Sequence, residues 1–97
     1  MSASIPLRDV TSTRAYVELQ QGGAVSWNLH VFNAAVYVQT GTGPAGGRID
    51  WRDEVLRVPG FHTFDGSARR IDAIRVRAAV APTSSTNTPR ITLDAET

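Results

Sequence analysis

The sequence predicts an all-β fold, a single small β-sandwich or jelly-roll-like barrel of about seven or eight short strands. Three observations support this class. Apolar and polar residues alternate along most of the chain, turn-forming residues separate the alternating runs, and no segment has the length and spacing of a stable helix. A chain of 97 residues can bury one modest core, so we expect a single domain.

The clearest of the seven or eight predicted strands are at 14–19, 25–31, 36–39, 54–58, 74–80 and 91–93. Residues 48–51 also look like a strand, and residues 1–13 could supply an edge strand. Alternation with a period of two puts one face of a strand on a core and the other toward solvent or a partner. The residues expected to face the core are Val17, Leu19, Val25, Trp27, Leu29, Val31, Val36, Val38, Ile74, Val76, Ala78, Val80, Ile91 and Leu93. Trp51, Val55 and Val58 are spaced roughly as on a helix, but Pro59 follows at once, so a strand is favoured there.

Turn signals fall between these strands. Residues 21–23 (Gln-Gly-Gly) are predicted to close a hairpin between the strands on either side. Residues 59–60 (Pro-Gly) fit the centre of a type II turn, and residues 65–66 (Asp-Gly) fit a type I′ turn. Residues 33–35 (Asn-Ala-Ala) are predicted as a bend, and the Ser- and Thr-rich stretch 82–89 as an exposed loop.

The first residues are more weakly patterned than the rest. We divide the chain into residues 1–13, an N-terminal arm or edge strand, and residues 14–97, a single β domain. Apolar residues alternate only loosely in the first part, and a proline in a strand confines it to an edge. An arm would become ordered only against a neighbouring molecule.

Composition argues against several classes of partner. The chain has no cysteine, which excludes disulfides and thiolate metal sites. Its net charge is +1 and its charges are interspersed, so neither nucleic acid nor a membrane surface is expected as a partner. No apolar run could span a bilayer and the first residues do not resemble a signal peptide, so we expect a soluble protein made in the cytoplasm.

All ten basic residues are arginine. Codons of GC-rich genomes favour arginine over lysine, so this bias indicates a high-GC bacterium or one of its phages. The alternative explanation is a surface rich in protein contacts, because the planar guanidinium group suits carboxylates and interfaces.

Residues that could support catalysis or bind a cofactor are few. His30 and His62 lie far apart in the sequence and neither has a nucleophile or a second metal ligand at motif spacing. The acidic cluster at 50–54 lacks the layout of a calcium loop and has arginines beside it. The glycine-rich loop 41–47 is not followed by a helix, which a phosphate-binding loop needs. We therefore expect no enzyme, no cofactor and no metal site.

A protein-binding surface is the remaining expectation. Aromatic side chains fall opposite the main apolar rows, and aromatic and arginine residues are enriched at interfaces. The candidate partner contacts are Ile5, Leu7, Val10, Tyr16, Phe32, Tyr37, Arg75 and Arg77. A sugar-binding platform would use similar aromatic residues, and a second buried sheet face would also explain them.

The order of these segments resembles the small β-sandwich virion proteins of tailed phages, including capsid decoration (cement) proteins and tail-associated modules. The resemblance rests on the segments 31–38, 41–47, 58–60, 63–66, 71–77, 82–89 and 91–93, and covers about residues 14–94. It implies a structural protein on the capsid surface of the virion, made in the host cytoplasm. The implied protein is a homotrimer that binds and stabilises the major capsid protein, with no nucleic acid, membrane or small-molecule ligand.

Two alternatives stay open. One is a receptor- or carbohydrate-binding module of a tail fibre or baseplate, which the outward aromatic residues and long loops favour. The other is a small enzyme, which could use only the two histidines and the acidic cluster at 50–54.

Overall fold

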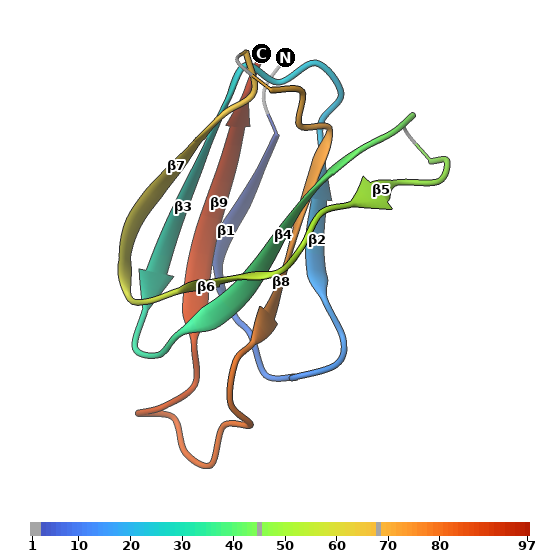
Figure 1. Ribbon diagram of the computed structural model, residues 1–97. Helices are drawn as coiled ribbons and strands as arrows, with labels where there is room; N and C mark the ends of the chain where they lie inside the picture. The colour runs from blue at the N-terminus through green and yellow to red at the C-terminus, as the bar shows by residue number, and fades with distance from the viewer. Residues whose placement is uncertain (1–2, 45, 68) are drawn as a thin grey trace.

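The computed structural model describes residues 3–44, 46–67 and 69–97. Two antiparallel sheets pack face to face in this part of the chain, with both termini at one end (Figure 1). The nine strands are β1 (Ala3–Asp9), β2 (Val17–Gln20), β3 (Ser26–Phe32), β4 (Val36–Thr42), β5 (Asp50–Trp51), β6 (Val55–Arg57), β7 (Gly60–Asp65), β8 (Ala73–Ala78) and β9 (Arg90–Glu96). The described residues include no helix, and so none that could cross a membrane.

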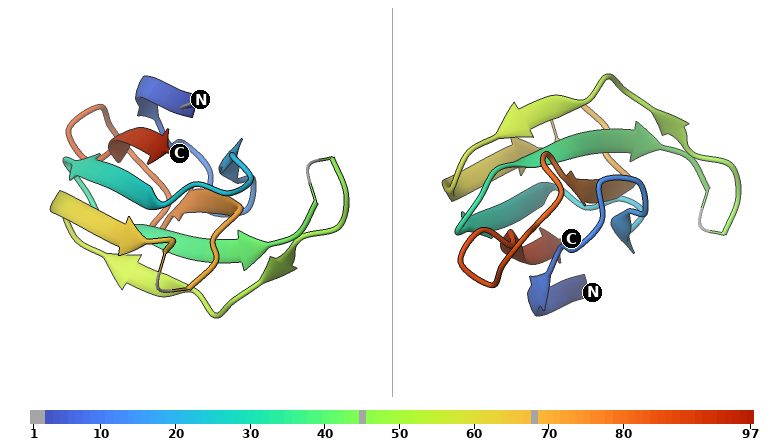
Figure 2. Two further views of the ribbon diagram at one scale, coloured as in Figure 1. Left: turned by 90° about the horizontal axis from the view of Figure 1, so that it is seen from above. Right: turned by 90° about the horizontal axis from the view of Figure 1, so that it is seen from below.

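The two halves of the chain pair like one long antiparallel ribbon. β1 pairs with β9, β2 with β8, β3 with β7, and β4 with both β5 and β6. The ribbon is wrapped so that β9 also pairs with β3 and β8 with β4. The resulting sheets have the orders β1-β9-β3-β7 and β2-β8-β4-β5, with β6 also on β4 (Figure 2).

This strand order is that of a jelly roll, the double-sheet arrangement of eight strands and two Greek keys. The ninth strand arises because residues 52–54 interrupt the partner of β4 and divide it into β5 and β6. The prediction of an all-β sandwich is confirmed.

The core lies between the sheets and follows the alternation of the sequence. Leu29 of β3 lies directly opposite Leu93 of β9, and both are fully buried. Trp27 is also fully buried, and its indole Nε1 donates a hydrogen bond to the carbonyl of Ile71 at 3.3 Å. This bond satisfies the one polar atom that the tryptophan brings into the core.

The sequence predicted two core positions wrongly. Val25 and Val80 are exposed. β3 begins at Ser26 and β8 ends at Ala78, so each valine lies just past the end of its strand. The alternation continues beyond the point where the second sheet covers the first.

Three of the predicted turns differ in the structure. Residues 21–23 do not close a hairpin, because β2 and β3 belong to different sheets. Residues 58–59 also carry the chain between sheets, and Gly60 has a φ of 147°, unlike the corresponding residue of a type II turn. Neither Asp65 nor Gly66 has a positive φ, which excludes the type I′ turn. The bend at 33–35 is present, with Asn33 at a φ of 72°.

The N-terminal segment is an edge strand of the sandwich. β1 pairs only with β9, and its register shifts between Ile5 and Arg8. Ile5 and Val10 are both buried in the core, and the Val10 amide donates to the Pro89 carbonyl at 2.8 Å. Residues 3–10 are therefore ordered by their own domain, while Met1 and Ser2 of the expected arm lie outside the described residues.

Truncation of one core leucine tests the wrapping of β9. We predict that Leu93→Ala lowers the free energy of unfolding by about 2–5 kcal/mol, because it leaves a cavity against Leu29. The control is Leu7→Ala on β1. The Leu7 side chain is 51% exposed, so its truncation should lower the free energy of unfolding by about 0.5 kcal/mol or less. Urea denaturation measures both, and equal costs would contradict the register of β9.

Candidate functional site

Four of the eight predicted contact residues gather on the outer face of the β2-β8-β4 sheet. They are Tyr16, Tyr37, Arg75 and Arg77, and Trp51 joins them from β5. We call these five residues the arginine–aromatic face. The register of the sheet explains the grouping, since Tyr37 of β4 lies directly opposite Arg77 of β8.

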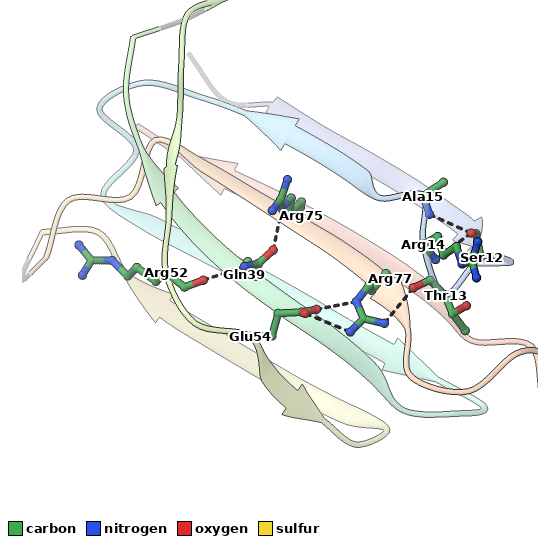
Figure 3. A network of polar contacts seen from close by, with 9 residues as sticks. All are labelled: Ser12, Thr13, Arg14, Ala15, Gln39, Arg52, Glu54, Arg75 and Arg77. Atoms are coloured by element: carbon green, nitrogen blue, oxygen red, sulfur yellow. Dashed lines mark hydrogen bonds and ion pairs between the residues drawn. The ribbon is translucent and has the colours of Figure 1, made fainter.

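Arg75 is held between two aromatic rings. Its guanidinium carbon lies 4.0 Å from the centroid of the Tyr16 ring and 4.2 Å from that of Trp51. Its Nε donates to Gln39 Oε1 at 2.8 Å, and Gln39 Nε2 donates to the carbonyl of Arg52, also at 2.8 Å (Figure 3). These contacts link β8, β4 and the segment after β5 into one network.

Arg77 joins the same sheet to two loops. Its Nε and Nη2 donate to the two carboxylate oxygens of Glu54 at 2.6 and 3.0 Å, and its Nη1 donates to the Thr13 carbonyl at 2.8 Å (Figure 3). Its guanidinium carbon lies 4.6 Å from the centroid of the Tyr37 ring. The hydrogen bond from Arg77 lowers the pKa of Glu54, and the same bond raises the pKa of Arg77.

The arginine–aromatic face is therefore a stabilised surface. Stacked cation–π pairs and a bidentate ion pair hold these side chains in one arrangement. Guanidinium groups already cover one face of the Tyr16, Tyr37 and Trp51 rings. These covered faces are not available to stack on a sugar ring.

The other four predicted contacts do not join this face. Ile5 and Val10 are buried in the core, so the expectation that they contact a partner is wrong. Leu7 lies on the edge strand β1, exposed and away from the arginine–aromatic face. Phe32 lies on the outer face of the other sheet, where its ring stacks on that of His30 at a centroid distance of 4.0 Å.

The two histidines lie on opposite faces of one sheet. His30 faces outward between Phe32 and Phe61, with its ring centroid 5.6 Å from that of Phe61. His62 pairs with the inward residue Leu29, and its Nε2 is 2.8 Å from the Val58 carbonyl. Within residues 3–44, 46–67 and 69–97, no three His, Asp or Glu side chains are grouped as metal ligands.

Asp72 is the buried residue that sequence reasoning missed. Its side chain is 2% exposed, and its carboxylate accepts hydrogen bonds from the amides of Gly43 at 2.9 Å and Gly23 at 3.4 Å. Arg70 Nε lies 3.0 and 2.9 Å from the two carboxylate oxygens. Burial raises the pKa of Asp72, but these donors, Gly43 foremost, outweigh it and hold the pKa below its usual range.

The backbone of Asp72 strengthens the same connection. Its carbonyl accepts from the Gln21 amide at 2.9 Å, and its amide donates to the Gly41 carbonyl at 2.8 Å. This group of contacts, which we call the Asp72 junction, fixes the β2–β3 connection and the end of β4 to the start of β8. Part of the glycine-rich loop 41–47 is therefore occupied by the protein's own carboxylate, and Ala45 of that loop lies outside the described residues.

A second feature that the sequence did not predict is a run of exposed apolar residues along one segment of the chain. Val55, Leu56, Val58 and Phe61 are four of the seven large apolar side chains that are exposed among the described residues. They fall in one short segment that includes β6 and the start of β7, and each of these strands lies at an edge of its sheet. We call these four residues the apolar corner, because they follow one another around the open edge of the sandwich. They do not share a face: Leu56 lies beside Tyr37 on the outer face of one sheet, and Phe61 lies beside His30 on the outer face of the other.

We compared the chain with known protein families, curated proteins and solved structures. No protein-family model, no curated protein and no solved structure matches the chain.

The Asp72 junction makes stability depend on pH. We predict that Asp72→Asn lowers the free energy of unfolding near pH 7 by about 1.5–3 kcal/mol, because a charged acceptor is lost. A carboxyl whose pKa is lowered by folding stabilises above its unfolded pKa of about 3.9, and this contribution is lost as pH falls. The difference between the wild type and the variant should therefore shrink as pH falls below about 4.

Urea titrations at several pH values measure this difference, and a constant difference down to pH 2 would contradict the role of the carboxylate. The matched control is Arg70→Gln. Arg70 is 72% exposed, and the amide donors to Asp72 remain in this variant. It should therefore lower the free energy of unfolding less than Asp72→Asn does.

A double-mutant cycle tests the ion pair of the arginine–aromatic face. We predict a favourable coupling between Arg77→Gln and Glu54→Gln, larger than the error of the measurement, because the pair is bidentate. Arg77→Lys should lose most of this coupling, since lysine cannot donate from two nitrogens. If the losses of unfolding free energy in the two single variants add up to the loss in the double variant, the two side chains do not interact in solution.

Proposed function

We propose that this chain is a structural protein of a tailed-phage virion and not an enzyme. In this proposal it is a capsid decoration protein that binds the outer surface of the major capsid protein as a homotrimer and stabilises the shell. It needs no cofactor, nucleic acid, membrane or small molecule for this role.

The apolar corner is the observation that carries the proposal. Four large exposed apolar side chains follow one another around the open edge of the sandwich, and a partner that wraps around this edge would bury them. The corner lies where both sheets end in an open strand, and open edges offer backbone donors and acceptors to another chain. Phe61, the most exposed of the four at 64%, would be its aromatic anchor.

The fold gives weaker support by analogy. Jelly rolls occur in viral capsid proteins and also in lectins, so the topology is compatible with both leading functions. The rigid arginine–aromatic face, with Arg75 and Arg77 already ordered, suits a polar surface beside an apolar contact. The covered ring faces weaken one of the observations behind the carbohydrate-binding alternative.

Binding to shells tests the proposal. We predict that the purified chain binds shells assembled from the major capsid protein of the same genome at a fixed stoichiometry. Sedimentation of the free protein should show a trimer of the 10.5 kDa chain. The double variant Leu56→Ser, Phe61→Ser should bind shells at least about tenfold more weakly, because it removes two apolar anchors.

The matched control is Val25→Ser, which changes an exposed valine at the start of β3, outside the apolar corner. It should bind like the wild type. Absence of binding to shells would overturn the decoration role, and a glycan-array signal lost on Phe61→Ser would replace it with the carbohydrate-binding alternative.

A further inference from the structure

A cavity opens between the two sheets beside the apolar corner. Its volume is about 550 Å³, within the range of small-molecule sites. The lining residues are Val38, Thr40, Arg52, Asp53, Val55, Arg57, Phe64 and Arg69. They come from β4, β6, β7 and the segments beside them, so the cavity is the open side of the sandwich where β5 and β6 are interrupted.

The charge of the cavity is unbalanced. Arg52, Arg57 and Arg69 face one carboxylate, that of Asp53. The ion pairs recorded among the described residues involve other arginines, and none includes these three. The Arg52 side chain extends away from Gln39 and Arg75, although its carbonyl accepts from Gln39 (Figure 3). The cavity thus combines a net positive charge with apolar walls.

Arg57 is the residue that most needs an acceptor. It pairs with the buried residue Val36 of β4, so its side chain starts on the inner face of the sheet. Its guanidinium carbon lies 5.2 Å from the centroid of the Phe64 ring. Its Nε is buried and is the one buried side-chain donor among the described residues with no hydrogen-bond partner. An unsatisfied buried donor of this kind is costly, and a small shift of the side chain would bring it to an acceptor bound in the cavity.

We infer that this cavity is a binding site for a carboxylate that carries an apolar body, with Arg57 as its principal donor. The guanidinium fork matches the two oxygens of a carboxylate, and Phe64, Val38 and Val55 would contact the apolar part. Three arginines beside Asp53 leave a net charge of +2, so the charge favours any anion, and the apolar walls favour a carboxylate with an apolar body over inorganic phosphate. The ligand is either a free small carboxylate or the terminal carboxylate of a peptide.

Titration of the ¹⁵N-labelled protein followed by NMR tests this inference, with the Arg57 Nε–H signal as the direct reporter. The probe is phenylacetate, and phenylacetamide is its neutral match. We expect phenylacetate to shift the Arg57 signal with a Kd of about 1–10 mM, as for a ligand of this size, and phenylacetamide to bind at least about tenfold more weakly. Inorganic phosphate should bind more weakly than phenylacetate.

Two variants and a control locate the site. Arg57→Gln should weaken phenylacetate binding by about tenfold or more, which corresponds to one charge-assisted hydrogen bond. Arg69 is exposed, so the variant Arg69→Gln should fold like the wild type. It should weaken phenylacetate binding about two- to fivefold, because one positive charge is lost. Arg8→Gln on β1, far from the cavity in the sheet order, should bind like the wild type.

A comparison of peptides distinguishes the two possible sources of the carboxylate, a small molecule and the end of a peptide chain. A short peptide that ends in phenylalanine with a free carboxylate is compared with the same peptide amidated at its end. Tighter binding of the free peptide than of phenylacetate assigns the site to a chain terminus, and the reverse order assigns it to a small molecule. No shift with either ligand, stronger binding of phosphate, or unchanged binding by Arg57→Gln would overturn the inference.

Discussion

The pairing of the two halves of the chain is the constraint on which the structure depends. β8 and β9 are the last strands to be made, yet each lies inside a sheet, between β2 and β4 and between β1 and β3. The first half therefore has no complete sheet of its own, and its apolar rows are covered only when the ribbon wraps. The Asp72 junction belongs to this wrapping, because it ties the β2–β3 connection and β4 to the start of β8.

The same wrapping decides where the surface can bind. Central strands have both edges occupied, so among the described residues the strands with an open edge are β1, β2, β5, β6 and β7. Of these, β6 and the start of β7 carry large exposed apolar side chains, with Leu56 on the outer face of one sheet and Phe61 on the outer face of the other. The interruption between β5 and β6 also leaves the sandwich open beside them, which creates the arginine-lined cavity. The proposed protein contact and the inferred carboxylate site are thus neighbours with one structural cause.

The sequence predicts what depends on local pattern. Alternation identifies the strands of Trp27 and Leu93 and places Tyr37, Arg75 and Arg77 on an outer face. It cannot show which strands pair, because a residue such as Gly23 carries the chain between sheets as readily as it closes a hairpin. For the same reason it missed Asp72, whose hydrogen-bond donors lie 29 and 49 residues away, and it placed Val10 on a partner instead of in the core.

Hydrogen exchange measured by NMR, for the free protein and for the protein bound to shells, tests the central claim that this jelly roll assembles through its β6–β7 side. We predict that amides of β3, β4, β8 and β9 exchange slowly in both states, since these strands are internal or held by the wrapped core. Amides of β6 and β7 should exchange quickly in the free protein and slowly on shells. New protection confined to β1 and β2, with β6 and β7 unchanged, would contradict the account.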